Sequence, residues 1–364
     1  MISRLVAVYH VRADAASIEG RARGIAVEQS VEMPLEAIDE PGVLSDIVGR
    51  VETISDLGGG LFAVRIALAL ATIGLDAGQL LNMLFGNSSL QDDVVLHDVE
   101  IPTDLAAGFG GPRQGLAGLR RRVGAAAGRA LTCSALKPQG LSSARLAGLA
   151  ARFARGGVDY IKDDHGLADQ PYSPFAERVP AIAAVLRDAG GTTRYVPSLS
   201  GDLDRMRAQL RVVRDAGVDT AMIAPMIAGA ATFQTLVREN PDIGFFAHPT
   251  LGGAARIAPD LLIGKLFRLF GADAVIFPTY GGRFGYSPET CRHLAENARA
   301  TGDSLRPAIP VPAGGMTLGR VAEKLDFYGP DTMLLIGGSL LLARGRLTEE
   351  TAAFTGAVAQ HVYR

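Results

Sequence analysis

One stretch of the sequence ends an apolar segment with four consecutive charged or titratable side chains. The run Gly156-Gly157-Val158-Asp159-Tyr160-Ile161 is followed directly by Lys162-Asp163-Asp164-His165. Unpaired charge is costly away from water, so a buried strand would not favourably continue through these groups. A strand whose carboxyl end opens into a cleft is more favourable, because the lysine and acids can then pair, hold a metal ion or act on a substrate. Lys162 and Asp164 share one face of such a strand, whereas Asp163 points away and is expected to be structural.

Apolar strands recur along the rest of the chain and alternate with helical stretches such as 144–153 and 203–214. Eight strands are predicted, at 130–136, 158–161, 195–199, 220–227, 244–247, 274–277, 308–311 and 333–336. Eight strands alternating with helices predict an α/β fold with a (β/α)8 TIM barrel, because a doubly wound sheet rarely reaches this count. The chemistry of such a barrel lies at the carboxyl ends of its strands.

These strand ends carry a set of polar groups that would converge on one rim. The first barrel strand ends in Lys137, the fifth in His248, and the sixth leads into a glycine-rich loop with Arg283. The last two strands end in the pairs Gly314-Gly315 and Gly337-Gly338. Glycine pairs that open onto helix N-termini commonly hold phosphate in barrels, since bare N–H groups can approach the anion. Each motif alone is usually only a turn, but together they predict a substrate with one phosphate.

The N-terminal part predicts a separate α+β domain. Its pattern gives helices at 15–25 and 77–85, and strands at 5–10, 27–32, 51–57, 61–69 and 94–101. Strands mixed with two helices are typical of a ferredoxin-like arrangement. We therefore expect an N-terminal domain over residues 1–108 and the barrel over residues 112–364, with the glycine-rich stretch 102–112 as the junction.

The composition excludes several classes of function. The chain has 364 residues, 48% hydrophobic residues and a net charge of -2, which is typical of a globular protein and not of a nucleic-acid binder. The most membrane-like stretch, 61–75, carries Arg65 and is too short to span a bilayer. Two cysteines and an N-terminus without a signal-peptide core predict a cytoplasmic location, with no disulfide framework.

In its strand-end motifs the chain resembles the large subunit of ribulose-1,5-bisphosphate carboxylase/oxygenase (RuBisCO). The stretch from Gly156 to Asp164 is similar to that family's signature. Further matches fall in the family's order at compatible spacing: Phe85-Gly86-Asn87, Leu136-Lys137-Pro138 and the two glycine pairs. The resemblance covers nearly the whole chain, including the N-terminal α+β domain.

The resemblance implies roles for individual residues. Lys162 corresponds to the lysine that CO2 carbamylates, and the new carboxylate would bind Mg2+ together with Asp164 and a third ligand, because Mg2+ prefers oxygen ligands. Lys137 corresponds to the base that removes a proton next to the substrate carbonyl. Glu28 and Asn87 correspond to residues that complete the active site of a neighbouring subunit. A homodimer with shared sites is therefore implied, and no small subunit is expected.

Departures from the family pattern are equally informative. His165 stands where the family has a glutamate as third metal ligand, and imidazole is a poorer partner for Mg2+. Gln139 replaces a second lysine, Arg283 matches the loop lysine in a different loop, and Pro249 replaces the arginine of a second phosphate clamp. Losing one clamp while keeping the glycine pairs predicts a monophosphate substrate and argues against CO2 fixation. The chain thus resembles the RuBisCO-like proteins (form IV).

Members of that group share proton abstraction beside a carbonyl and differ in the steps that follow. The activity we favour is isomerisation of 5-methylthioribulose 1-phosphate in sulfur salvage. The alternatives are decarboxylation of 3-oxo-isoapionate 4-phosphate and enolisation of 2,3-diketo-5-methylthiopentyl 1-phosphate. A catalytically silent barrel with a binding or regulatory role is the non-enzyme alternative, although a scaffold would not need Lys137, Lys162 or Asp164.

In the isomerase scheme, the glycine pairs and Arg283 bind the phosphate and Lys137 moves the proton. His248 contacts a substrate hydroxyl or serves as a second acid–base group. The predicted metal ligands are Lys162, Asp164 and His165.

Overall fold

The computed structural model describes residues 3–363, which form two compact units. The first unit contains the chain up to Gly110 together with the segment Leu251–Leu262. The second contains Gly111–Thr250 and the chain from Ile263 onward. The domain ranges 1–108 and 112–364 stay a prediction. Within the described residues, no helix has both the length and the apolar character needed to cross a membrane.

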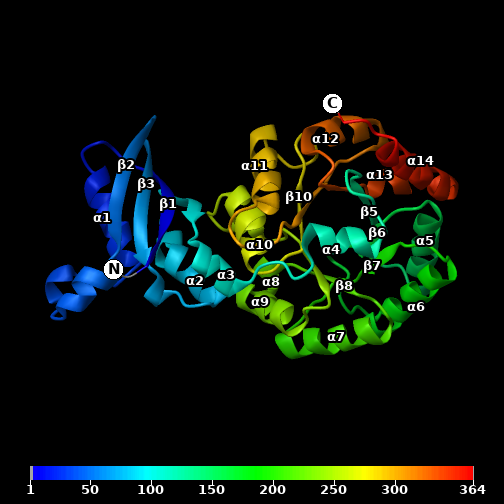
Figure 1. The fold of residues 1–364 in the computed structure, drawn as a ribbon, viewed down its shortest axis with the longest axis horizontal. Helices are drawn as coiled ribbons and strands as arrows, with labels where there is room; N and C mark the ends of the chain where they lie inside the picture. Colours follow the sequence, from blue (N-terminus) through cyan, green and yellow to red (C-terminus); the bar gives the residue numbers. More distant parts are fainter. Residues whose placement is uncertain (1–2, 364) are drawn as a thin grey trace. The chain divides into compact units, whose positions relative to one another are not determined.

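The first unit is built on one antiparallel sheet with the strand order β2-β3-β1-β4 (Figure 1). Its main elements follow the ferredoxin-like sequence β-α-β-β-α-β, and α3 (Thr103–Phe109) then leads out of the unit. They are β1 (Arg4–Arg12), α1 (Ile18–Glu28), β2 (Arg50–Gly58), β3 (Leu61–Ala69), α2 (Ala77–Phe85) and β4 (Val94–Glu100).

Alternation along β1 explains how this sheet packs. Leu5, Ala7, Tyr9 and Val11 are fully buried, while the residues between them face the other side of the sheet. The buried hydroxyl of Tyr9 donates a hydrogen bond of 2.6 Å to the carbonyl of Leu84 in α2, so this polar group is satisfied inside the core.

The strand predicted at 27–32 is wrong. Helix α1 continues through Glu28, and the chain then turns. The side chain of Gln29 is buried and donates to the carbonyls of Asn82 (3.2 Å) and Met83 (2.9 Å). The apparent alternation of valines with polar residues therefore reflects a helix end whose polar side chain bonds to the backbone near the end of α2.

The second unit contains the eight predicted strands, all parallel, and their positions are confirmed. They are β5 (Leu131–Leu136), β6 (Tyr160–Asp163), β7 (Arg194–Val196), β8 (Thr220–Ile223), β9 (Gly244–Ala247), β10 (Ala274–Pro278), β11 (Ile309–Ala313) and β12 (Met333–Leu335). The strand predicted at 220–227 is shorter than expected, because Pro225 begins helix α8 (Pro225–Ala228).

The eight strands are arranged in two four-stranded sheets, ordered β12-β5-β6-β7 and β11-β10-β9-β8. A parallel bridge between Ser198 and Met222 joins one edge of the first sheet to one edge of the second. One cluster of buried side chains receives at least one residue from each of the eight strands. The unit is thus an α/β structure with parallel sheets around a shared core, and closure into a single barrel stays a prediction.

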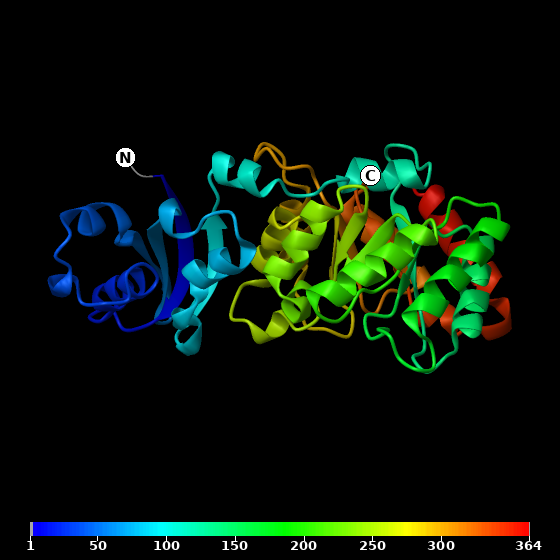
Figure 2. The same cartoon turned by 90° about the horizontal axis from the view of Figure 1, so that it is seen from below.

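Helices of the second unit lie on the outside of these strands (Figures 1 and 2). The side chains of Ser142, Asp202 and Ser287 cap α5, α7 and α11 by accepting a backbone N–H of the first turn. The helices are α4 (Gly115–Arg122), α5 (Ser143–Arg155), α6 (Phe175–Asp188), α7 (Leu203–Asp215), α9 (Ala230–Glu239), α10 (Phe267–Leu269), α11 (Pro288–Arg299), α12 (Val321–Tyr328), α13 (Gly338–Leu341) and α14 (Leu347–Ala359), besides α8.

Candidate active site

A cavity of about 340 Å³ lies at the carboxyl ends of the strands of the second unit. Every site residue that the sequence predicted for this unit lines it. They are Lys137, Lys162, Asp164, His165, His248, Arg283, Gly314, Gly315, Gly337 and Gly338. The expectation that residues at the strand ends lie around one cavity is therefore met, although their chemical roles stay predictions.

The pairing register of β5 and β6 explains why the first residues meet. Leu136 pairs with Asp163, so the two strands end at the same level and Lys137 and Asp164 follow side by side. The ammonium group of Lys137 contacts Oδ2 of Asp164 as an ion pair. The candidate base and a candidate metal ligand are therefore partners in this structure.

Lys162 lies deeper than Lys137, with only 4% of its surface exposed. Its Nζ donates a hydrogen bond of 2.8 Å to the carbonyl oxygen of Asp163. Burial lowers the pKa of Lys162, because the charged form loses its hydration. This environment increases the share of the neutral amine, the form that can react with CO2.

Asp164 supplies a carboxylate to the cavity wall. Its Oδ1 lies 2.8 Å from Nδ1 of His165, and its Oδ2 contacts Lys137. Burial alone would raise its pKa, but the hydrogen bonds from His165 and Lys137 and the charges of the two lysines outweigh burial and lower the pKa of Asp164. The carboxylate is therefore ionised at neutral pH.

His248 follows β9 and stacks on His165, with the ring centroids 4.7 Å apart and the planes 7° from parallel. Burial, followed by the charge of Lys162, lowers the pKa of His248 to about 2. The imidazole is thus neutral at neutral pH, and its Nδ1 contacts the hydroxyl of Thr250. The predicted roles narrow accordingly: His248 is a weak base, and because its Nδ1 accepts the backbone N–H of Thr250, Nε2–H is left as a hydrogen-bond donor.

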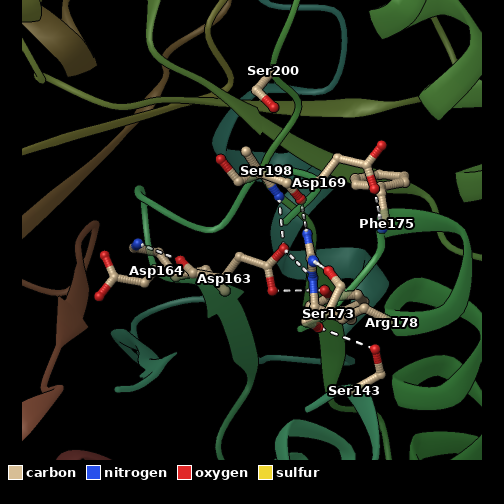
Figure 3. A network of polar contacts seen from close by, with 12 residues as sticks. Ser143, Asp163, Asp164, Asp169, Ser173, Phe175, Arg178, Ser198 and Ser200 are labelled. Atoms are coloured by element: carbon tan, nitrogen blue, oxygen red, sulfur yellow. Dashed lines mark hydrogen bonds and ion pairs between the residues drawn. The ribbon is translucent and has the colours of Figure 1, made fainter. Parts of the chain in front are cut away.

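Asp163 points away from the cavity, as the alternation along the strand predicts. Figure 3 shows its carboxylate directed opposite to that of Asp164, toward Arg178 and Ser198. Asp163 and Arg178 are both fully buried.

The glycine pairs are placed differently from the expected helix N-termini. A 3₁₀ turn at Leu318–Arg320 separates Gly314 and Gly315 from α12, and Gly338 begins a helix of only four residues. Gly315 instead contacts the loop after β10: a Cβ on Gly315 would lie 2.7 Å from Cα of Gly282. This close backbone approach holds the pair against the loop that carries Arg283.

Three residues that were not predicted as site residues also lie at the cavity or beside Glu28 and Asn87. Thr317 and Ser339 line the cavity, and the hydroxyl of Ser339 donates a hydrogen bond of 2.9 Å to the carbonyl of Met316. The position of Ser339 directly after Gly337-Gly338 was the available signal. Glu32, in the first unit, is the third.

Glu28 and Asn87 lie together within the first unit. The amide of Asn87 donates hydrogen bonds of 2.9 Å to the carboxylates of both Glu28 and Glu32. A cavity of about 180 Å³ borders these three side chains. The predicted pair is thus joined by a second acid, Glu32, which has a positive φ of 53°.

The donor set for a metal ion is incomplete as it stands. Within residues 3–363, no three His, Cys, Asp or Glu side chains are grouped so that they could hold a metal ion. Of the predicted ligands, Asp164 offers a carboxylate and His165 an imidazole, whereas a lysine ammonium offers no lone pair. The residues fit Mg2+ only if Lys162 carries an added carboxylate, since Mg2+ requires oxygen ligands.

Comparisons with known proteins agree on one family. A family model described as ribulose bisphosphate carboxylase large chain, catalytic domain, matches residues 115–359. A protein of Rhodospirillum rubrum named 5-methylthioribulose-1-phosphate isomerase is 64% identical over 363 residues, which cover 99% of this chain and 97% of that protein.

More distant and structural matches fall in the same family. A Geobacillus kaustophilus protein named 2,3-diketo-5-methylthiopentyl-1-phosphate enolase is 33% identical, covering 76% of this chain and 70% of its own length. The crystal structure of a Rubisco-like protein from Rhodopseudomonas palustris superimposes with a TM-score of 0.93, at 54% identity and with full coverage of both chains.

Proposed function

This chain belongs to the ribulose bisphosphate carboxylase large-chain family, and we propose that it isomerises 5-methylthioribulose 1-phosphate without fixing CO2. The observation that carries this proposal is the 64% identity, over 99% of the chain, to the relative named for that activity. The cavity supports it, because about 340 Å³ is within the usual range for a small-molecule site.

We also propose that the eight strands close into one (β/α)8 barrel over residues 112–364, with residues 1–108 as a separate domain. Two observations support closure. All eight strands contribute to one core cluster, and the Ser198–Met222 bridge links the two sheets at one side. A hydrogen bond of 3.0 Å from Thr332 to the carbonyl of Pro310 adds a contact at the other side.

In this proposal the substrate phosphate lies against Gly314, Gly315, Gly337 and Gly338, with Arg283 as its cation. Lys137 takes the proton from the carbon next to the carbonyl on Nζ and delivers a proton to the former carbonyl carbon, while the carbonyl oxygen gains a proton and the adjacent hydroxyl loses one. Each such step moves the carbonyl by one carbon, so two successive steps give the net 1,3 proton shift. His248, as a neutral imidazole whose Nδ1 accepts the backbone N–H of Thr250, donates a hydrogen bond from Nε2 to a substrate hydroxyl oxygen. Lys137 must first leave Asp164 and release a proton to solvent, because an ammonium has no lone pair with which to accept one.

Mg2+ would be held by Lys162 as its carbamate, by Asp164 and by His165. When bound, the ion would polarise the substrate carbonyl and acidify the adjacent C–H bond. The lowered pKa of Lys162 supports carbamylation, because the neutral amine adds CO2 and then loses a proton.

We further propose a homodimer in which Glu28 and Asn87 complete the active site of the other subunit. Their hydrogen bond shows how a carboxylate and an amide are held as one polar unit. The two cysteines, Cys133 and Cys291, are buried and free, which supports a reducing cytoplasmic location.

Turnover in deuterium oxide tests the proposed activity. The enzyme is incubated with 5-methylthioribulose 1-phosphate, Mg2+ and bicarbonate, and the products are followed by phosphorus and proton NMR. We expect an isomeric phosphate that retains its methylthio group and carries solvent deuterium. The Lys137→Ala variant should lose this activity, and undiminished turnover in that variant would rule out the scheme.

The enolase activity is the second candidate, supported by the 33% identical relative of that name. The same assay run with 2,3-diketo-5-methylthiopentyl 1-phosphate separates the two activities. Faster turnover of the diketone than of the ribulose derivative would replace the isomerase proposal with the enolase.

A further inference from the structure

We infer that Arg178 is a positioning residue that holds the loop carrying Asp164 and His165 in its working geometry. It does not touch the cavity, which lies on the opposite side of β6. Its predicted effect on turnover rests on the proposed function, whereas its effect on the loop does not.

Arg178 extends from the first turn of α6 and is completely buried. Its guanidinium makes three directed hydrogen bonds, and each ties a different part of the segment together. Nε donates to Oδ2 of Asp163 at 3.3 Å, Nη2 to the carbonyl of Ala168 at 2.7 Å, and Nη1 to the carbonyl of Ser173 at 2.6 Å. One side chain therefore fixes the end of β6, the middle of the following loop and the start of α6.

Asp163 is the second half of this anchor. Besides Arg178, it accepts hydrogen bonds from the hydroxyl of Tyr195 at 2.7 Å and from the backbone N–H of Ser198 at 3.1 Å (Figure 3). The end of β6 is thereby attached to β7 as well as to α6. Because Asp163 lies between Lys162 and Asp164 in sequence, fixing its position constrains both neighbours.

The loop between the anchors has its own internal bonds. The backbone N–H of Leu167 donates to the carbonyl of Asp164 at 2.9 Å, and the side chain of Gln170 donates to the carbonyl of Gly166 at 2.7 Å. At the far end, Asp169 accepts the N–H of Phe175 at 2.7 Å. These bonds make the loop a compact unit, so displacement of its anchor points would move Asp164 and His165 with it.

A guanidinium is required for this arrangement. Its planar donors point in fixed directions and can serve three acceptors at once, whereas a lysine ammonium is a single point charge on a flexible stem. Removal of Arg178 alone should destabilise the protein, because the charge of Asp163 would stay buried without its ion-pair partner.

The consequence for catalysis follows from the precision that a reaction demands. Site groups must be held close to their productive positions, and a displacement of about 1 Å caused by a remote change can lower turnover by about 100-fold. Asp164 contacts both Lys137 and His165, so a shift of this loop disturbs the candidate base and the candidate metal ligands together.

The test compares Arg178→Met and Arg178→Lys with a matched variant at another buried arginine. Arg268 is 2% exposed and likewise joins an aspartate, Asp303, to several carbonyls, but it lies away from the cavity. Arg268→Met therefore removes a buried guanidinium and its bonds to an aspartate and to carbonyls without a link to the site, although Asp303 is 37% exposed and Asp163 is not exposed at all. The double variant Asp163→Asn/Arg178→Met removes both charges and keeps the test usable if Arg178→Met alone does not fold.

Two readouts are measured on each full-length variant. One is the kcat and KM for 5-methylthioribulose 1-phosphate. The other is the imidazole signal of His165 in protein labelled with carbon-13 at the Cε1 position of histidine, assigned by comparison with His165→Gln. The NMR readout needs no substrate, so it separates failure of this inference from failure of the proposed activity.

We expect Arg178→Met to shift the His165 signal and to lower kcat by about 100-fold, with a smaller change in KM. Arg178→Lys should restore part of kcat and should move the His165 signal part of the way back to its wild-type position. The double variant should regain thermal stability but not turnover or the His165 signal. Arg268→Met should lose stability while keeping the wild-type signal and kcat. An unchanged His165 signal in folded Arg178→Met, or equal losses of kcat in Arg178→Met and Arg268→Met, would overturn the inference.

Discussion

Arg283 stands in the cavity wall as an exposed cation whose guanidinium lies 5.1 Å from the centroid of the Phe284 ring. If it binds the substrate phosphate, Arg283→Gln should raise KM by about 10- to 100-fold, which is the usual weight of a hydrogen bond to a charged group. kcat should change little, because the contact exists before and during the reaction. The KM of Arg283→Lys should lie between those of the wild-type protein and Arg283→Gln, since lysine keeps the charge but cannot donate two parallel hydrogen bonds.

Initial-rate kinetics would measure this effect, with Arg292→Gln as control. Arg292 also stacks on an aromatic ring, that of Phe327 at 5.2 Å, but does not line the cavity. A fall in kcat with unchanged KM would instead mean that Arg283 acts in the chemical step.

Side-chain direction was predictable at the level of single residues, but the ionisation state was not. The alternation along a strand separates Lys162 and Asp164 from Asp163, and the structure agrees. The neutral state of His248 depends on burial and on the charge of Lys162, which come from distant parts of the chain. For the same reason the ion pair between Asp163 and Arg178, fifteen residues apart, could not be predicted from the sequence.

Among the connecting loops, Gly315 combines a positive φ with a close approach to another backbone segment. Its φ of 101° lies in a region that side chains rarely adopt, and a Cβ there would meet the backbone of Gly282. Gly315→Ala should therefore lower the free energy of unfolding by about 1–3 kcal/mol. It should also raise KM, because the Arg283 loop is pushed away.

Thermal or denaturant unfolding would measure the loss of stability, with Gly148→Ala as the control. Gly148 lies inside α5 with no atom within 4 Å of its added Cβ, and alanine is the better helix former. Equal stability of Gly315→Ala and the wild-type protein would show that the loop yields without cost.

Asp273, just before β10, should make stability depend on pH. It is fully buried, accepts backbone N–H groups of Gln114, Gly115 and Phe245, and burial raises its pKa to about 6. Because the folded-state pKa lies above the ordinary value of 3.8, the folded protein binds the extra proton between those values. The contribution of Asp273 to stability is thus present below about pH 4 and is lost as the pH rises through about 6.

The difference in unfolding free energy between the wild-type protein and Asp273→Asn would reveal this contribution. The wild-type protein should lose stability relative to Asp273→Asn as the pH rises from about 4 to about 6. Comparing the two proteins cancels the opposite effect of carboxylates with lowered pKa values, such as Asp242 beside Arg214. A difference that is constant over this range would show that the carboxylate of Asp273 keeps its ordinary pKa.

At the level of elements, strong periodicity was sufficient for the eight parallel strands and for most helices. It failed at 27–32, where a helix end mimicked alternation, and the glycine pairs were read only as anion sites. The packing of Gly314 and Gly315 against the Gly282 loop could not be foreseen, because it joins segments more than thirty residues apart in the chain.

The proposed homodimer with shared active sites has a consequence that can be tested on the whole molecule. Lys137→Ala and Asn87→Ala would each inactivate a homodimer, the first in the barrel and the second in the N-terminal unit. A mixed dimer would still contain one site with both residues intact, so co-expression of the two variants should restore activity. A mixed dimer that stays inactive would show that each site is completed within one chain.

The family and its fold were predictable over nearly the entire chain, because the motifs are spaced along all of it. The spatial division was less accessible. Leu251–Leu262 belongs to the first unit although it lies in the middle of the second in sequence, and only long-range contacts reveal such an assignment.

The contact between Gly282 and Gly315 also restricts how this enzyme can evolve. A side chain at Gly282 would collide with the carbonyl of Gly314, and one at Gly315 would collide with Gly282. Neither position can therefore drift alone, and the loop bearing Arg283 is inherited together with the glycine pair. We expect selection for a substrate with a different anionic end to act first on Arg283 and Phe284, while the glycines beneath them stay fixed.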